Sequence, residues 1–323
     1  MDNRIKADLE KSYNLICNQV APVGGGWLNL KWRILTGGGE FLVKQYSMER
    51  YSKEQVERIE AALQRQAILE KSGVKCPQLR QHEGRVIRWL GDDIAYMVMA
   101  FCPGQTQKAE TTTLLQMRSL GSVCAVMHYE FSRLPTQWEE SLPVFGGYTK
   151  EQLLQWFEKQ AAKCGPGANT EYRAALLAIE PILARLAPDF FERFGKGLTH
   201  EDFQAGNILF DASGVSAILD FDRNCYAYPR HDVGRAILSF ALEGDIMNTN
   251  KVQAFAEGYS QHLPLTLPDI ADALRLTWCI EMQWWIKPMF FEDSGERGEI
   301  PLRFRDEVLW LTKHWGELDL ILR

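Results

Sequence analysis

The spacing of apolar residues changes near Pro103-Gly104, and this change constrains the fold more than any other feature of the chain. Before it, "NLKWRIL" and "EFLVKQY" alternate between apolar and polar residues like half-buried strands, and "TGGG" between them supplies a turn. Residues 53–72 form one helical pattern among these strands, whereas most later segments have helical spacing. We therefore expect an α+β chain with a β-rich lobe at residues 1–103 and a large α-helical lobe at residues 104–323.

The α-helical lobe contains one predicted hairpin. "NILFD" and "SAILDFD" have the composition of strands, and "ASG" between them can form the turn. The segments with helical spacing are residues 110–132, 150–163, 170–194, 230–243, 250–260, 268–290 and 303–320. In the small lobe, "RVIRWL" and "AYMVMAF" add a further pair of strands, so the sequence predicts strands around one main helix there.

The composition is that of an ordinary globular protein and excludes several kinds of partner. The 323 residues are 46% hydrophobic and carry a formal net charge of −6, so no basic excess indicates nucleic-acid binding. The chain begins with the charged run "MDNRIKADLEK", and no apolar run approaches the roughly 18 residues of a membrane helix. Seven scattered cysteines without a CxxC pair argue against disulfides and zinc, so we expect a cytoplasmic protein with no membrane partner.

A histidine, carboxylates and an amide are concentrated in "LTHEDFQAGNILF", residues 198–210, just before a predicted strand. The pattern His200-x-Asp202-x4-Asn207 fits the catalytic loop of phosphoryl-transfer enzymes with a kinase-like fold. In such a loop the aspartate accepts the proton of an attacking hydroxyl, so we predict Asp202 as the general base. For His200, packing beneath the loop is the favoured interpretation.

Asn207 and Asp220 are the predicted metal ligands. Asn207 begins the predicted hairpin and Asp220 ends it, in "AILDFD", so the turn brings their side chains together. Mg²⁺ prefers oxygen ligands and usually takes one or two from protein, with phosphates and water completing its shell. We therefore expect Mg²⁺ and ATP as cofactors, with GTP as an alternative nucleotide. Asp222 has two open interpretations: it faces a second metal ion, or it forms a hydrogen bond within the turn.

Lys44, in "FLVKQY", occupies the strand on which a kinase-like fold needs a lysine for the phosphates. The period of two places Leu42 on the same face, where it could cover an adenine ring. Such a lysine normally pairs with a carboxylate on the following helix. Glu57 and Glu60 are the candidates, with Gln64 one turn later, and we favour Glu60.

Two backbone segments are further candidates for nucleotide contacts. "VGGG" could bring the backbone at Gly25 and Gly26 close to the phosphates, although a plain turn explains a run of glycines equally well. "MAFCPG" is the predicted hinge between the lobes. There Met99, the carbonyl of Ala100 and the N–H of Cys102 would meet the adenine edge.

Together these segments resemble the superfamily of aminoglycoside phosphotransferases, choline kinases and type II homoserine kinases, which has a protein-kinase-like fold. The resemblance spans most of the chain in the family's order. It rests on "FLVKQY", "YMVMAFCPG", "LGSVCAVMH", "THEDFQAGN", "AILDFD", "YPRHDVGRA" and "FAEGYSQHLPL". It implies a bilobal fold with a small nucleotide-binding lobe and a large lobe for catalysis and acceptor binding. The implied reaction is ATP-dependent transfer of the γ-phosphate to a hydroxyl of a small molecule.

The resemblance also assigns roles to individual residues. It implies that Asp202 is the base, that Asn207 and Asp220 hold the metal, and that Asp232 is a buried aspartate bracing the catalytic loop.

Three positions depart from the family's frequent residues. Glu201 and Gln204 stand where glycine and histidine are frequent, and Ala100 stands where glutamate is frequent. These are variable positions, so they concern the substrate class more than the chemistry.

The acceptor is expected on helices of the large lobe, and "WCIEMQWWIKP" is one candidate segment. Trp278, Glu281 and Trp285 share a helical face by their spacing of three and four residues. Aromatic rings and a carboxylate could hold a cationic amine, and an aromatic core stripe is the alternative interpretation. Aminoglycosides, amino alcohols, homoserine-like amino acids and sugars all stay open as acceptors.

Two other functions compete with phosphotransfer. One is a nucleotide-binding pseudokinase with a regulatory role, although base, metal ligands and lysine are all present. The other is an iron-dependent oxygenase, in which His200, Asp202 and a later histidine such as His231 would hold iron. That chemistry usually occupies a β jelly roll, which the helix-rich lobe argues against. Protein substrates fit poorly, because no activation segment with an A-P-E ending follows Asp220.

Overall fold

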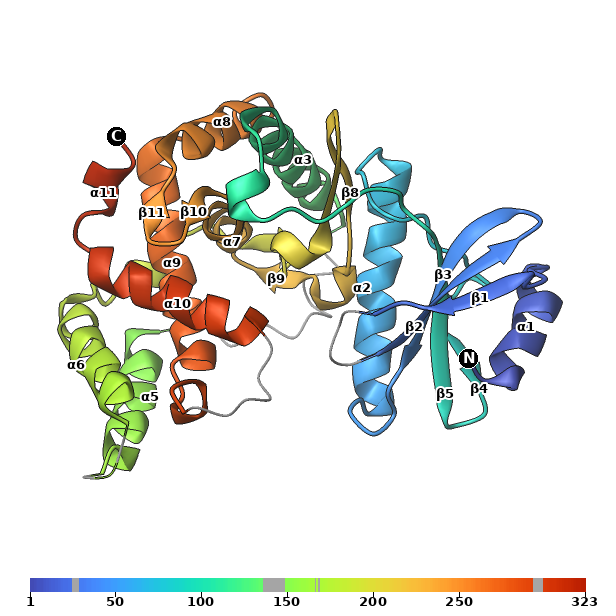
Figure 1. Cartoon of the computed structure of the whole chain (residues 1–323), viewed down its shortest axis with the longest axis horizontal. Helices are drawn as coiled ribbons and strands as arrows, with labels where there is room; N and C mark the ends of the chain where they lie inside the picture. The colour runs from blue at the N-terminus through green and yellow to red at the C-terminus, as the bar shows by residue number, and fades with distance from the viewer. Residues whose placement is uncertain (25–28, 136–148, 166, 168, 293–298) are drawn as a thin grey trace. The chain divides into compact units, whose positions relative to one another are not determined.

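The computed structural model describes residues 1–24, 29–135, 149–165, 167, 169–292 and 299–323. These residues form two compact units. The first comprises Met1–Thr106 and Gly206–Asn224, and the second comprises Gln107–Ala205 and Cys225–Arg323. The first unit contains an antiparallel sheet and the second is mostly helical, which confirms the predicted α+β fold class (Figure 1). The functional division at residue 103 stays a prediction. Among the described residues, no helix is long and apolar enough to span a membrane.

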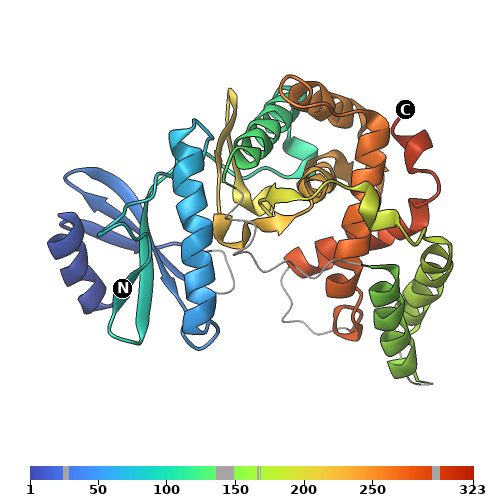
Figure 2. The same cartoon turned by 180° about the vertical axis from the view of Figure 1, so that it is seen from behind.

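A five-stranded sheet with the order β1-β2-β3-β5-β4 forms the body of the first unit, and every neighbouring pair is antiparallel. Its strands are β1 (Gln19–Pro22), β2 (Leu30–Thr36), β3 (Gly39–Tyr46), β4 (Arg88–Leu90) and β5 (Ile94–Ala100). Helices α1 (Asn3–Tyr13) and α2 (Lys53–Lys71) lie on opposite faces of the sheet (Figures 1 and 2). The sheet is therefore covered on both sides.

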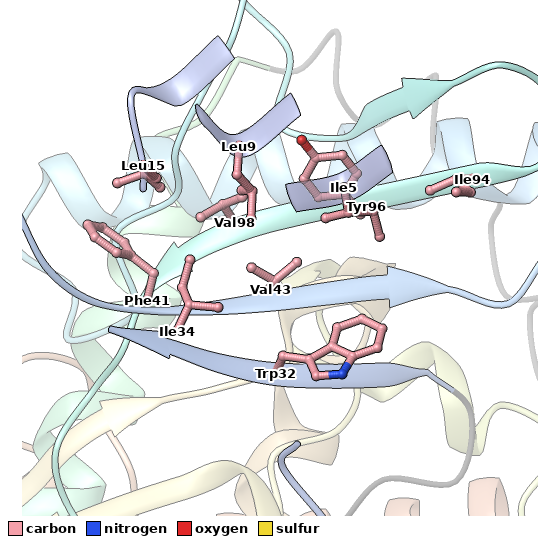
Figure 3. Packing of buried hydrophobic residues seen from close by; sticks show 10 residues of the cluster. All are labelled: Ile5, Leu9, Leu15, Trp32, Ile34, Phe41, Val43, Ile94, Tyr96 and Val98. Carbon is pink, nitrogen blue, oxygen red and sulfur yellow. The ribbon is translucent and has the colours of Figure 1, made fainter. Parts of the chain in front are cut away.

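Alternate residues of β3 point to the two faces of this sheet. Phe41 and Val43 pack with Ile5 of α1 in one apolar core (Figure 3). Tyr46 packs with residues of α2 in a second core. Because side chains alternate along a strand, Lys44 lies on the same side as Tyr46, facing α2.

Helix α1 is absent from the sequence-based prediction, which placed a single helix among the first strands. Its two fully buried apolar residues, Ile5 and Leu9, are one turn apart, and most of its other residues are polar or charged. Asp2 caps the helix by accepting a hydrogen bond of 2.7 Å from the backbone N–H of Arg4. Two apolar positions in such a short segment give a weak periodic signal, so packing on the sheet stabilises α1 more than its own pattern does.

The predicted hairpin late in the chain is confirmed, and it belongs to the first unit. Its strands are β7 (Ile208–Asp211) and β8 (Gly214–Ile218), and the short helix η4 (Phe221–Arg223) follows them. The backbones of Gln105 and Phe210 exchange two hydrogen bonds of 2.9 Å. Beyond the hairpin, the side chain of Asn224 accepts a hydrogen bond of 2.6 Å from Arg65 of α2. Both the hairpin and the turn after it are thereby tied to the rest of the first unit.

Helices make up most of the second unit. They are α3 (Leu114–Ser132), α5 (Lys150–Lys163), α6 (Thr170–Arg185), α7 (Pro229–Ala241), α8 (Thr249–Tyr259), α9 (Leu267–Trp285), α10 (Glu299–His314) and α11 (Leu318–Ile321). The strand pairs are β6 (Gly197–Thr199) with β9 (Cys225–Ala227) and β10 (Leu242–Glu243) with β11 (Ile246–Met247). Short helices are η1 (Ala109–Thr111), η2 (Phe190–Arg193), η5 (Pro288–Phe290) and, at the boundary of the two units, η3 (Ala205–Asn207).

Most predicted helices agree with these bounds within a few residues, and three segments differ clearly. The segment predicted as residues 303–320 is divided into α10 and α11. The segment predicted as residues 170–194 ends as a helix at Arg185, before Pro188. The segment predicted as residues 268–290 ends at Trp285, before Pro288. A proline disfavours helical backbone in the residue before it, which agrees with the end of α9. Helix α6 continues through Pro181, so Pro188 alone does not explain its end.

Helices α3 and α8 lie side by side, and two glycines allow their backbones to approach closely (Figure 1). A Cβ atom at Gly121 of α3 would overlap the carbonyl oxygen of Phe255, and one at Gly258 of α8 would overlap the carbonyl oxygen of Arg118. Neither backbone carbonyl can move aside as a flexible side chain could. The crossing therefore depends on the absence of side chains at both positions.

We expect Gly121→Ala to lower the free energy of unfolding by about 1–3 kcal/mol, because overpacking forces the two backbones apart. Urea unfolding followed by circular dichroism measures the change. Gly316→Ala is the matched control, since a Cβ atom there meets nothing within 4 Å. Equal stability of the two variants would show that α3 and α8 do not cross at this distance.

Candidate active site

Lys44 is the centre of a buried group of charges in the first unit. Its side chain is 4% exposed, and its Nζ lies 2.7 Å from Oδ1 of Asp220 and 2.7 Å from Oδ2 of Asp222. The hydroxyl of Tyr46 donates a hydrogen bond of 3.4 Å to the other oxygen of Asp222. Burial alone would lower the pKa of Lys44, but the two carboxylates raise it well above its usual value, so the ammonium group stays charged.

Asp220 and Asp222 differ in their surroundings. The side chain of Asp220 is 34% exposed, whereas that of Asp222 is 10% exposed. Burial raises the pKa of Asp222, and the positive charge of Lys44 opposes this effect. Asp220 has a φ of 63°, a left-handed conformation that is uncommon for a residue with a side chain. Asp220 is therefore the more accessible of the two carboxylates, although both lie 2.7 Å from Nζ of Lys44.

The residues predicted to hold a metal fit Mg²⁺ by their chemistry. The backbone N–H of Leu219 donates a hydrogen bond of 2.7 Å to the carbonyl of Asn207, so the residue before Asp220 is paired with Asn207 across the hairpin. Across the described residues, no group of three or more His, Cys, Asp and Glu side chains is arranged to hold a metal. One amide and one carboxylate oxygen suit a hard cation that takes its other ligands from phosphates and water.

Glu60 does not pair with Lys44, and this prediction is wrong. Its carboxylate instead accepts hydrogen bonds from the backbone N–H groups of Val86 and Ile87, at 3.0 and 2.6 Å. A third donor, the side chain of Gln64, lies 2.6 Å away. Buried N–H groups need acceptors, and Glu60 supplies them for a segment just before β4.

The predicted adenine contacts stay predictions. Leu42 is buried on β3, and Met99 and Ala100 are half-buried at the end of β5. Cys102 is also half-buried. The predicted phosphate contacts at Gly25 and Gly26 lie outside the described residues.

A buried aspartate holds the loop after β6 in the second unit. Asp232, on α7, is fully buried and accepts hydrogen bonds from the Thr199 hydroxyl and the N–H groups of His200 and Glu201, at 2.6, 2.7 and 3.0 Å. His128 lies 3.1 Å from the same carboxylate. Burial would raise the pKa of Asp232, but His128, His200 and the Thr199 hydroxyl lower it below its usual value.

Residues 200–205, hereafter the catalytic loop, carry the predicted base. His200 is fully buried, and its Nδ1 accepts a hydrogen bond of 3.3 Å from the N–H of Asp202. The N–H of Gln204 donates to the carbonyl of Asp202 at 3.0 Å. The imidazole of His200 thus packs under the loop, as expected, and the backbone around Asp202 is held by local hydrogen bonds.

Trp278 cannot contact an acceptor, so this prediction is wrong. The ring is fully buried, and its Nε1–H donates a hydrogen bond of 2.8 Å to the hydroxyl of Thr312. Its centroid lies 4.8 Å from that of Trp315. Trp285 is half-buried and stacks on Phe304 with 4.7 Å between centroids. The alternative interpretation, a core stripe, describes Trp278.

Glu281 is also not free to bind a cationic acceptor. Its Oε1 lies 3.0 Å from Nε of Arg235 and 3.2 Å from Nε2 of His231, both on α7. Burial would raise the pKa of Glu281, but these two cations lower it. The carboxylate of Glu281, which was predicted to bind a cationic acceptor, is thus neutralised within the protein.

Glu281 belongs to a larger group of ion pairs that sequence reasoning missed, hereafter the charge network, in which every side chain except that of Arg303 is at most 10% exposed. Its members are Glu201, His231, Arg235, Glu281, Arg303 and Glu307. His231 Nδ1 lies 3.6 Å from Oε1 of Glu201, and Nη1 of Arg235 lies 2.7 Å from Oε2 of Glu307. Arg303 Nε lies 3.3 Å from Oε1 of Glu307. The spacing of four residues between His231 and Arg235, and between Arg303 and Glu307, was the available signal.

The first unit thus contains a strand lysine paired with acidic residues of a later turn, and the second contains an aspartate loop braced by a buried carboxylate. Residues 19–265 match the model of the phosphotransferase enzyme family, and the chain belongs to this family. It is therefore a small-molecule phosphotransferase. Its fold is not the jelly roll on which the oxygenase alternative depended.

Individual relatives agree with this assignment. Homoserine kinase of Methylobacillus flagellatus is 21% identical over 279 residues, which are 85% of this chain and 81% of that protein. The structure of a spectinomycin phosphotransferase with ADP and spectinomycin has a TM-score of 0.68 and 14% identity, covering 97% of this chain and 98% of that one. A microcompartment-associated aminopropanol kinase has a TM-score of 0.63 and 18% identity, covering 100% and 99%. At these identities the two structures show the shared fold.

The charge network makes a prediction about pH. Burial alone would lower the pKa of His231, but Glu201 and Glu281 raise it to about 10. The unfolded chain has a histidine pKa near 6.5, so stabilisation by the imidazolium is complete below about pH 6.5 and is lost as the pH rises to about 10. The stability advantage of the wild type over His231→Gln should therefore shrink with pH, by at most about 1.4 kcal/mol per pH unit.

Urea unfolding of both proteins between pH 6 and pH 10 measures this difference, and working with a difference cancels the titration of other groups. His262→Gln, at an exposed histidine, is the matched control. An advantage that stays constant or grows with pH would mean that His231 is neutral in the folded protein.

Proposed function

We propose that the chain catalyses Mg²⁺-dependent transfer of the γ-phosphate of ATP to a hydroxyl group of a small molecule, with Asp202 as the general base. The observation that carries the proposal is the contact of Lys44 with Asp220 and Asp222. In kinase-like enzymes, a strand lysine and the aspartate of this turn meet the nucleotide phosphates and the metal. Membership of the phosphotransferase family and the ADP bound by the spectinomycin phosphotransferase support the same function.

The first unit would bind the nucleotide. Lys44 would contact the phosphates, and Asp222 would keep its ammonium group in place, since Asp222 is the less exposed of its two partners. Asn207 and the more exposed Asp220 would hold Mg²⁺. When bound, the metal supplies positive charge that neutralises the phosphate oxygens as the bond to the leaving group breaks.

The second unit would supply the base. The acceptor hydroxyl attacks the γ-phosphorus, its proton passes to the Asp202 carboxylate, and the bond between the γ-phosphorus and the β–γ bridging oxygen breaks to release ADP. The hydrogen bonds of Asp232 to residues 199–201 limit the freedom of the residues just before Asp202. A base that is held in position accelerates the reaction more than a mobile one, because the geometry of attack is set before the reaction.

The acceptor is proposed to be a small alcohol that also carries an amino group. Two relatives are named for homoserine and aminopropanol, and both compounds have a hydroxyl and an amino group. The earlier candidate anchor for that amine, Glu281, is neutralised by Arg235 and His231, so the amine would need another partner.

The direct test is an assay with γ-labelled ATP, Mg²⁺ and a panel of acceptors that includes homoserine, aminopropanol and spectinomycin. The proposal predicts a labelled phosphate ester of at least one acceptor, formed in equal amount with ADP. A protein that binds no nucleotide in the presence of Mg²⁺ would contradict the proposal for every acceptor at once.

Asp202→Asn should lower kcat by about 10²- to 10⁴-fold, because an amide cannot accept the hydroxyl proton. The affinity for ATP should change little, since the nucleotide residues lie elsewhere in the chain. Steady-state kinetics with the best acceptor separates kcat from the KM for ATP. Asp245→Asn, at an exposed carboxylate on the β10–β11 turn, is the control. Wild-type turnover in Asp202→Asn would remove this residue from the mechanism.

Asp220→Asn should weaken Mg²⁺ binding about tenfold or more, because it removes a negative ligand from a cation that prefers anionic oxygen. Isothermal titration of Mg²⁺ into the protein with a non-hydrolysable ATP analogue measures this without turnover. Binding of the analogue in the absence of metal serves as the control for an intact nucleotide site. The same Mg²⁺ affinity in both proteins would show that Asp220 is not a ligand.

A further inference from the structure

The charge network reaches the catalytic loop at two points. At one end, His231 faces the carboxylate of Glu201, the residue before Asp202. At the other end, Nη2 of Arg303 donates a hydrogen bond of 3.1 Å to Oε1 of Gln204. Asp202 and its neighbour in the chain are therefore flanked on both sides by residues that the network holds.

Between these ends the network is a continuous chain of ion pairs. Glu281 contacts both His231 and Arg235, and Glu307 contacts both Arg235 and Arg303. With His231 protonated, three cations balance three carboxylates. Because each interior charge depends on its neighbours for compensation, a change at one member disturbs the others. The two contacts with the loop are thus coupled through helices α7, α9 and α10.

The backbone at Glu201 does not favour a glutamate. Its φ is 63°, in the left-handed region where glycine is unstrained and other residues are not. Nevertheless its side chain is only 10% exposed. Oε1 of Glu201 and Nδ1 of His231 have no hydrogen-bond partner among the described residues, and the two atoms face each other at 3.6 Å. The contact with His231 therefore explains why a strained position carries a long acidic side chain.

We propose that the charge network is a positioning device for the proposed base: Glu201 and Arg303 act as positioning residues that hold the catalytic loop on both sides of Asp202. The role of Asp202 itself rests on the proposed function. The physical attachment of the loop to the network does not.

Electrostatics within the second unit agree with this role. Burial lowers the pKa of Arg303, while Glu307 and Asp202 are among the carboxylates that oppose the decrease. Asp202 also contributes to raising the pKa of Arg235. Both guanidinium groups therefore interact electrostatically with Asp202.

The first arm of the test is amide hydrogen exchange of the full chain, which needs no turnover. Glu201→Gln and Arg303→Gln remove one charge from each end of the network. We expect the segment 199–205 to exchange roughly tenfold faster in both variants while α8, which carries no member of the network, is unaffected, because local attachments control local opening. Glu257→Gln, which breaks the exposed ion pair with Arg118, is the matched control and should leave the loop unchanged. Unchanged exchange of the loop in both variants would overturn the proposal.

The second arm is steady-state kinetics. A positioning role predicts a decrease in kcat of about 10- to 100-fold with little change in the KM for ATP. Glu201→Gly separates positioning from stability, because it relieves the left-handed backbone and removes the contact with His231. We expect its melting temperature to be maintained and its kcat to fall. A loop that loosens in the variants with kcat unchanged would overturn the positioning role. A wild-type protein with no phosphotransfer would contradict the proposed function, and the exchange measurement would still decide whether the network holds the loop.

Discussion

The fully buried carboxylate of Asp232 is the interaction on which the catalytic loop depends. An ionised group in the interior needs partners that replace its lost hydration. Here the partners are His128, the hydroxyl of Thr199 and the backbone N–H groups of His200 and Glu201. The two backbone contacts fix the course of the chain just before Asp202. Replacing any of these donors would leave a buried charge short of a partner, which is why the arrangement has few alternatives.

The same requirement applies to the other buried charges. In the first unit, buried Lys44 needs negative partners, and Asp220 and Asp222 meet this need at the end of the hairpin. In the second unit, the charge network extends the principle from single pairs to a chain that crosses three helices. Both the charges around Lys44 and the charge network connect a proposed site residue to helices or strands that are distant in sequence. Charge pairing in the interior, rather than apolar packing alone, therefore sets the positions of the proposed site residues.

Local patterns predicted what depends on local spacing. The strand of Lys44 and the loop of Asp202 and Asn207 follow from alternation and from a short motif, and the fold class follows from the change of period along the chain. The failures concern choices between distant partners. Helical spacing showed that Glu60 and Glu281 lie on helices. It could not show that Glu60 accepts hydrogen bonds from backbone N–H groups of a later segment, or that Glu281 pairs with cations of α7. Such pairings exist only after the chain has folded.

The central claim is a direct transfer of the γ-phosphate to the acceptor, with Asp202 receiving a proton rather than the phosphate. The stereochemistry at phosphorus tests it most directly, using ATP made chiral at the γ-phosphorus with oxygen isotopes and the acceptor that the panel identifies. A single in-line displacement inverts the configuration, and inversion is the result that this account predicts. Retention would require two displacements through a phosphorylated side chain, and it would contradict the assignment of Asp202 as a base.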